Sequence, residues 1–233
     1  MPQTSATVSY DVTEGIGFVV LDNPPVNAAS HDLRAGLLAA VQALEADERA
    51  RAIVLYGAAR AFIAGADIRE FGQPVQPPSL PEVCKVIEDC AKPVVAALHG
   101  PTLGGGLEVA ISAHARVAHP DTILWFPEVT LVLLPGSGGT QRTPRLIGIE
   151  ATLALVTSGR RIGASEALEL GLIDRVAEGT PADIALAAGC DAASGALTTR
   201  RTADLTVPPD DAALDRFRAD LAARQGHLFA PQR

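Results

Sequence analysis

The sequence predicts an α/β fold. Short apolar runs typical of β-strands alternate with segments of helical periodicity along most of the chain. The chain has 233 residues, enough for one large domain or two small ones with a substantial core. Of these residues 48% are hydrophobic but only 4% are aromatic, so we expect a core built mainly from Ala, Val, Leu and Ile.

The N-terminal third is expected to form a β-hairpin, a helix and a buried strand. Two apolar runs flank a turn at Glu14 and Gly15, and Ser30 stands where an N-cap residue precedes apolar residues at helical spacing. These elements are expected at residues 8–12, 16–21, 30–45 and 52–56, with a breaker segment at 23–27.

The middle of the chain is expected to lead into a turn of three glycines. Residues 71–81 are rich in Pro and Gln, which indicates a surface loop that could lie over a site. A helix at residues 81–90 and a strand at 93–98 follow, and then Gly104, Gly105 and Gly106 open a helix at residues 107–114.

The C-terminal half is expected to be mostly helical. Gly171 has the position of a C-cap glycine. Helices are expected at residues 140–147, 150–157, 165–170 and 181–188, strands at 116–118, 123–126 and 173–177, and a last amphipathic helix from Asp210 or Asp211 to Ala222. The composition shifts after residue 189, which predicts a core at residues 1–189 and a short helical C-terminal region at 190–233.

Charge and cysteine content narrow the function classes. The net charge of −8 argues against nucleic acid as the main partner but allows a local basic pocket for a phosphorylated ligand. The three cysteines follow no metal or disulfide spacing, which suits a reducing compartment. The first residues lack signal-peptide features and no apolar run reaches membrane-spanning length. We therefore expect a soluble cytoplasmic protein with no metal ion and no membrane partner.

The stretch HGPTLGGGLEVA, residues 99–110, carries the first candidate site. It reads as the end of a strand, a glycine turn and a helix start, with Glu108 in the first helical turn. Glycines let the backbone approach a ligand, and unpaired amides at a helix start favour negative charge. On this segment alone, Glu108 is either an ordinary first-turn acid or a catalytic one.

A second acid, Glu128, follows another β-like run. Two carboxylates facing one pocket can divide acid–base work, one accepting a proton and the other donating it. Backbone amides at Ala66 and in the glycine turn could polarise a carbonyl, each such donor being worth roughly 2.7–4 kcal/mol. Spacing alone leaves open whether these groups meet.

Four other known site motifs are excluded, because the sequence lacks residues that each of them requires. The glycine turn lacks the Lys-Ser or Lys-Thr of a P-loop, and residues 136–139 lack the final glycine of a dinucleotide fingerprint. Ser137 is not in a GxSxG elbow, and the histidines do not form HExxH. His99 is interpreted as a structural histidine and Asp67 as a loop or capping acid.

Three ordered motifs carry a family resemblance. AFIAGADIREF (residues 61–71), the stretch 99–110 and FPEVTLVLLPGSGGTQRTPRLIG (126–148) resemble the enoyl-CoA hydratase/isomerase, or crotonase, family. The match covers roughly residues 7–180. NPPVNA (23–28) and RRTADL (200–205) look most like the hydratase portion of the multifunctional β-oxidation enzymes.

The resemblance implies a crotonase-like spiral of ββα repeats and an acyl-CoA thioester substrate, with no cofactor beyond the CoA of that substrate. It also implies a homotrimer or hexamer. By similarity, the amides of Ala66 and Gly105 form an oxyanion hole, and Glu108 and Glu128 are the two hydratase glutamates. Positions that line the substrate by similarity are Ala64, Asp67, Ile68 and Gly136.

Several positions depart from the family pattern. Trp125 and Val132 stand where the family usually has glycine. The indole of Trp125 either narrows the space near Glu128 or faces away and fills core. The C-terminal region is shorter than in the family. The sequence therefore does not predict which residues form the outer wall of the CoA pocket, or how the copies assemble.

Three functions are compatible with these residues. The first is an enoyl-CoA hydratase of fatty acid metabolism, a lyase that adds water syn to trans-2-enoyl-CoA and gives 3-hydroxyacyl-CoA. The second is a Δ3,Δ2-enoyl-CoA isomerase, in which one glutamate moves a proton. The third is a non-catalytic CoA-ester-binding or assembly protein. The presence of both glutamates favours the first.

Overall fold

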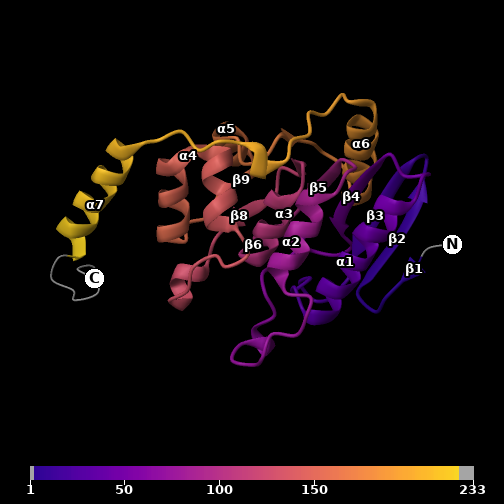
Figure 1. Cartoon of the computed structure of the whole chain (residues 1–233), viewed down its shortest axis with the longest axis horizontal. Coiled ribbons are helices and arrows are strands. Elements are labelled where there is room, and N and C mark those ends of the chain that lie inside the picture. Colours follow the sequence, from indigo (N-terminus) through magenta and orange to yellow (C-terminus); the bar gives the residue numbers. More distant parts are fainter. Residues whose placement is uncertain (1–2, 226–233) are drawn as a thin grey trace.

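A computed structural model describes residues 3–225 of the chain. Its centre is a seven-stranded sheet of order β1-β2-β3-β4-β5-β7-β10 (Figure 1). β2 and β3 form an antiparallel hairpin, and the pairs from β3 to β10 are parallel. The strands are β1 (Gln3–Thr4), β2 (Val8–Thr13), β3 (Ile16–Leu21), β4 (Ala52–Gly57), β5 (Val94–Leu98), β7 (Ala115–Ala118) and β10 (Arg175–Val176).

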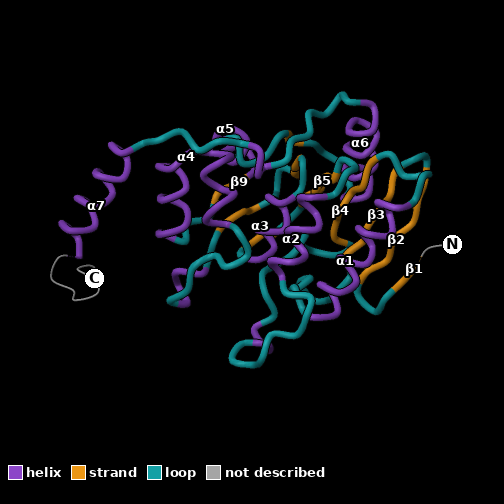
Figure 2. The backbone as a smooth tube through the Cα atoms, in the orientation of Figure 1, coloured by secondary structure: helices purple, strands orange, loops and turns teal. Residues whose placement is uncertain are grey.

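Helices cover both faces of this sheet (Figure 2). Along β4, Ile53 and Leu55 pack into one core and Ala52 and Val54 into the other, because successive strand residues face opposite sides. Helices of the first core are α1 (His31–Ala46), α2 (Leu80–Asp89) and α3 (Gly105–Ser112), and the second core is covered by α6 (Pro181–Ser194). The predicted α/β class is confirmed.

A second, three-stranded sheet stands beside the start of α3. It consists of β6 (Pro101–Leu103), β8 (Ile123–Trp125) and β9 (Ile162–Gly163). β6 and β8 are parallel, and β8 and β9 are antiparallel. The strand β6 was not expected, because residues 99–106 read as one turn. Gly100, with φ +55°, separates β6 from β5.

The helix predictions agree with the structure in type and differ in extent. Ser30 accepts a hydrogen bond from Leu33 N and caps α1 as predicted. The helices expected at residues 140–147 and 150–157 are the two halves of α4 (Gly139–Ser158), which Gly148 interrupts at φ 79° and ψ 173°. α5 (Ala164–Leu170) ends at Gly171, whose φ is 84°.

The C-terminal helix α7 (Asp211–Gln225) contacts α4 and lies away from the central sheet (Figure 1). The predicted boundary after residue 189 falls inside α6, which packs on β4 and β5. Short 3-10 helices are η1 (Ile68–Glu70), η2 (Glu128–Leu131) and η3 (Thr202–Asp204). None of the helices in the described residues has the length and apolarity to cross a bilayer.

Candidate active site

The glycine turn brings two distant segments into contact. A Cβ on Gly106 would collide with the carbonyl oxygen of Ile63, so the absence of a side chain lets the segment before Ala66 lie against the start of α3. Gly104 adopts φ +51°, and its amide donates to the carbonyl of Trp125 at 3.0 Å. This turn therefore sets the position of the first amides of α3.

The amides of Ala66 and Gly105 are neighbours. The nitrogen of Ala66 is 3.8 Å from the position that a Cβ of Gly105 would take. Within the described residues, neither amide donates to another protein group. Gly65, at φ +89°, redirects the chain just before Ala66. Two amides without a protein partner in the described residues therefore lie close together, beside the glycine turn.

Glu108 is buried and oriented by backbone amides. Its side chain is enclosed at the first turn of α3, with the residue only 2% exposed. Oε1 accepts hydrogen bonds from Ser137 N at 2.6 Å and from Gly139 N at 2.8 Å, at the start of α4. Burial raises the pKa of Glu108, while the two amide donors act in the opposite direction. The carboxylate is thus fixed in one orientation.

Glu128, the first residue of η2, lies beside the glycine turn. Its Oε1 is 2.8 Å from the position that a Cβ of Gly104 would take. Its Oε2 is buried without a hydrogen-bond partner in the described structure. Burial, with a smaller contribution from the charge of Glu108, raises the pKa of Glu128 to about 7. The two predicted acids and the two predicted amides therefore converge on the same turn.

A cavity of about 410 Å³ is lined in part by Ala66. Its walls include Asp67 and Leu80, and a Leu80 methyl, Cδ2, lies 2.5 Å from the Cβ position of Gly105. The carboxylate of Asp67 caps η1 and pairs with Arg69 at 2.6 Å, as expected of a capping acid. Ile68 is 74% exposed.

Two further predicted positions lie apart from this cavity. Ala64 pairs with Leu103 in an isolated bridge, and its amide donates to Val26 O at 3.1 Å. Gly136 lines a second cavity, of about 530 Å³, on the side of Lys85. Gly136 is connected to the site through the next residue, Ser137, whose amide donates to the carboxylate of Glu108.

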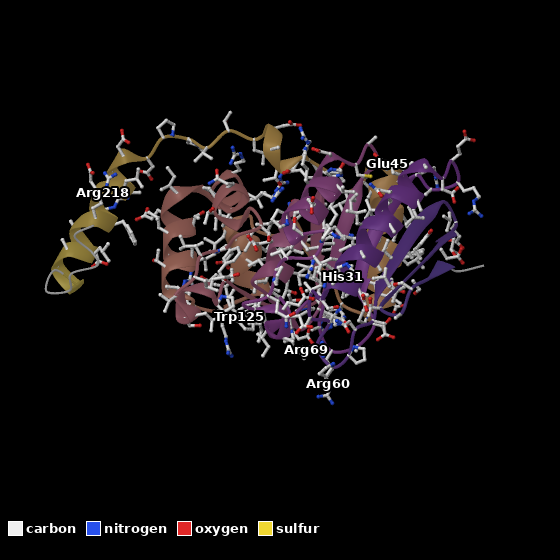
Figure 3. All side chains as sticks on the ribbon, turned by 60° about the horizontal axis from the view of Figure 1, so that its bottom comes forward. His31, Glu45, Arg60, Arg69, Trp125 and Arg218 are labelled. Atoms are coloured by element: carbon white, nitrogen blue, oxygen red, sulfur yellow. The ribbon has the colours of Figure 1, made fainter. Side chains whose placement is uncertain are left out.

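Trp125 does not fill the core. Its neighbour Leu124 is fully buried, while Trp125 is half-buried on the opposite face of β8. The guanidinium of Arg161 lies over the indole at 4.7 Å from the ring centroid. Figure 3 shows Trp125 and Arg69 in the lower half of the view, below His31. The other departure, Val132, is 94% exposed and adopts φ 59°, a conformation that favours glycine.

Arg34 and Leu80, which also line the first cavity, were not predicted from the sequence. Arg34 is buried on the face of α1 that also carries Leu37 and Val41, three and seven residues further on. A charged residue at the spacing of an apolar face was the available signal, because buried charges need partners. Leu80 gave no such signal. No group of His, Cys, Asp and Glu suited to a metal ion occurs in residues 3–225.

Comparison with known proteins places these motifs in one family. The family model described as enoyl-CoA hydratase/isomerase matches residues 11–185. The peroxisomal bifunctional enzyme of Danio rerio is 44% identical over 197 residues, which are 84% of this chain and 27% of that protein. A probable enoyl-CoA hydratase of Bacillus subtilis is 39% identical over 173 residues, 71% of this chain and 67% of that protein.

Solved structures agree with the sequence matches. The enoyl-CoA hydratase of Bacillus anthracis superposes with a TM-score of 0.72 at 31% identity, covering 81% of this chain and 76% of that one. The enoyl-CoA hydratase of Thermoplasma volcanium gives a TM-score of 0.74 at 27% identity, covering 94% and 86%. The predicted crotonase-like fold is confirmed. The chain spans about a quarter of the length of the peroxisomal bifunctional enzymes that it matches.

Proposed function

The chain belongs to the enoyl-CoA hydratase/isomerase family, and on that premise we propose that it hydrates trans-2-enoyl-CoA thioesters to 3-hydroxyacyl-CoA. The observation that carries the proposal is the position of Glu128. Its carboxyl group lies against Gly104 in the glycine turn, with one buried oxygen that has no partner in the described structure. An acid in that position has a proton available near neutral pH.

The amides of Ala66 and Gly105 would bind the thioester oxygen. Addition of water to the 2,3-double bond moves electron density onto that oxygen and gives an enolate. Because both amides lack a protein partner in the described residues, they can donate to the oxygen without breaking an existing bond. Donors aimed at developing charge stabilise the transition state by roughly 2.7–4 kcal/mol each.

The two glutamates would divide the proton transfers. Burial raises the pKa of Glu108, and the two amide hydrogen bonds to its Oε1 oppose that shift by stabilising the ionised form. In this ionised form Glu108 takes a proton from water as the hydroxyl adds to C3. Glu128 keeps its proton because one of its oxygens is buried and unpaired, and it gives that proton to C2. One water is consumed, and solvent exchange returns the proton from Glu108 to Glu128.

Crotonyl-CoA tests this assignment directly. Hydration removes the conjugated double bond, so the absorbance of the enoyl thioester falls. We expect turnover by the wild-type protein and a loss of about 10²–10⁴-fold in Glu128→Gln. Conversion of a 3-enoyl-CoA without hydration would instead indicate the isomerase. CoA-ester binding without turnover of either substrate would indicate a binding protein.

The proposal also covers the oligomeric state, the cofactor and the cellular location. We propose an assembly of three or six copies, supported by the exposed apolar run Leu131, Val132, Leu133 and Leu134, which are 54%, 94%, 49% and 68% exposed. Light scattering in solution measures it. The proposed chemistry uses no cofactor beyond the CoA of the substrate, and the cytoplasmic location stays a prediction.

A further inference from the structure

Arg34 is a buried charge that no step of the proposed hydration uses. It comes from the first turn of α1, and its side chain is only 7% exposed. A buried guanidinium is tolerated only where its donors are bonded. The groups that accept those donors therefore show what Arg34 holds in place.

The guanidinium of Arg34 joins three segments of the chain. Nε donates to Pro78 O at 2.8 Å, and Nη2 donates to Gln76 O at 3.3 Å. Nη1 donates to Ala29 O at 2.9 Å and to Glu70 Oε2 at 2.7 Å. The accepting groups lie before α1, at the end of η1 and in the loop that precedes α2.

Two of these segments lead to the two free amides. Ala29 forms an isolated parallel bridge with Ala66, in which Ala29 N donates to Gly65 O at 2.8 Å. Pro78 lies two residues before Leu80, the side chain that contacts the Cβ position of Gly105. One guanidinium is thus connected to the Ala66 side and to the Gly105 side of the site.

Glu70 completes the arrangement. Its Oε2 accepts from Arg34, and its Oε1 accepts from the amide of His31 at 2.7 Å, at the start of α1. A carboxylate at a helix N-terminus is favourable, and it compensates the buried charge of Arg34. The pair therefore holds η1 and the cavity wall against α1.

We propose that Arg34 is a positioning residue that fixes the separation of the Ala66 and Gly105 amides. It acts through Ala29 on one side and through the loop of residues 76–80 on the other. The kinetic part of the inference rests on the proposed hydratase function. The spectroscopic part below depends only on binding of a CoA ester.

The test compares Arg34→Lys with Arg49→Lys, which changes an exposed arginine paired with Asp47. Lysine keeps the charge but cannot reach four acceptors in fork geometry. We expect kcat for crotonyl-CoA to fall by about 10- to 100-fold in Arg34→Lys with a small change in KM, because the amides act mainly on the transition state. Arg49→Lys should match the wild type.

The second readout is the absorption of bound 2,4-hexadienoyl-CoA, a conjugated thioester. Amides that donate to its carbonyl oxygen polarise it and shift the absorption to longer wavelength. We expect the shift in the wild type and in Arg49→Lys, and a clearly smaller one in Arg34→Lys. If Arg34→Lys is unfolded by circular dichroism, Glu70→Gln replaces it, because it leaves Arg34 present but removes the negative charge and one of the two oxygens that accept from Arg34 and His31.

The outcomes separate the two proposals. A wild-type kcat and a full shift in Arg34→Lys overturn the role of Arg34 and leave the hydratase proposal standing. A shift in the wild type without hydration overturns the hydratase proposal, and the role of Arg34 is then decided by the size of the shift in its variant. No shift in the wild type overturns both.

Discussion

The carboxylate of Glu108 and the backbone of Gly139 are in direct contact at the start of α4. Oε1 of Glu108 accepts a hydrogen bond from Gly139 N at 2.8 Å. A Cβ on Gly139 would stand 3.1 Å from that same oxygen. The acid that we assign to water activation is thus held by a backbone position with little room for a side chain.

Gly139→Ala should impair both stability and hydration. The new methyl would also stand 2.8 Å from Pro135 Cβ and 3.0 Å from Phe126 Cε1, so either the start of α4 or the carboxylate must shift. We expect the free energy of unfolding to fall by about 1–3 kcal/mol. Urea unfolding and crotonyl-CoA hydration measure the two effects. Gly163→Ala is the control, because its Cβ meets open space at φ −84°. Equal behaviour of the two variants would contradict the prediction.

The raised pKa of Glu128 predicts a pH-dependent stability. Its pKa is 4.5 ordinarily and about 7 in the folded protein, so the folded state keeps a proton that the unfolded chain releases between these values. The contribution of this group is therefore fully present below its ordinary pKa and is lost as the pH rises through the folded value. Glutamine carries no charge at any pH. Relative to wild type, Glu128→Gln should be more stable at about pH 8 than at about pH 5, measured by urea unfolding.

The same ionisation should control the rate. If Glu128 donates a proton to C2, hydration declines as the pH rises through about 7, because the donor is lost. The measurement is a pH profile of kcat/KM for crotonyl-CoA, which reports the pKa values of the free enzyme. A profile without a decline above neutral pH would contradict the assignment of Glu128 as the proton donor.

Val132→Gly should stabilise the fold. Val132 adopts φ 59° and ψ 32°, where a β-branched side chain is strained. At 94% exposure it packs little within its own chain, so the prediction applies to the unassociated chain. We expect a gain of up to about 1 kcal/mol, after the entropic cost of glycine, in thermal or urea unfolding. Val75 is also exposed but has no positive φ, so Val75→Gly should be neutral or destabilising. A loss of stability in Val132→Gly would contradict the expected strain.

Trp125 and Arg161 should be energetically coupled. The guanidinium lies 4.7 Å from the indole centroid, and Arg161 is exposed. A double-mutant cycle of Trp125→Leu and Arg161→Ala should give a coupling of about 0.5–1 kcal/mol. Arg160 is the matched control, because its partner is Glu166. A cycle with Arg160→Ala should give no coupling to Trp125.

Local sequence patterns predicted the elements that depend on neighbouring residues. The hairpin turn at Glu14 and Gly15, at φ 53° and 82°, and the Ser30 cap are decided by the chemistry of a few adjacent positions. The strands β6 and β9 could not be predicted in the same way. They have three and two residues and exist because β8 lies between them, which is a contact between distant segments.

In the site too, local features could be predicted from the sequence, and contacts between distant segments could not. Glu108 and the glycine turn could be predicted from one stretch of twelve residues, 99–110. The hydrogen bonds of Arg34 could not be predicted, because its acceptors lie 5, 36, 42 and 44 residues away along the chain. The placement of Trp125 depended on its register beside Leu103 and on Arg161, which directly precedes β9, the neighbouring strand. Only the assembled fold brings these partners together.

The oxyanion donors assigned to Ala66 and Gly105 belong to the main chain. Position 66 is already alanine, and an alanine at position 105 would meet a Leu80 methyl but keep its N–H, so an alanine scan removes neither donor. Deleting a donor requires an ester linkage in place of the peptide bond, introduced by semisynthesis or with a hydroxy acid. Ordinary mutations therefore impair the two donors only at residues that shape the loops around them. Gly106 is one such residue, because a side chain there would push Ile63 away and separate the donors.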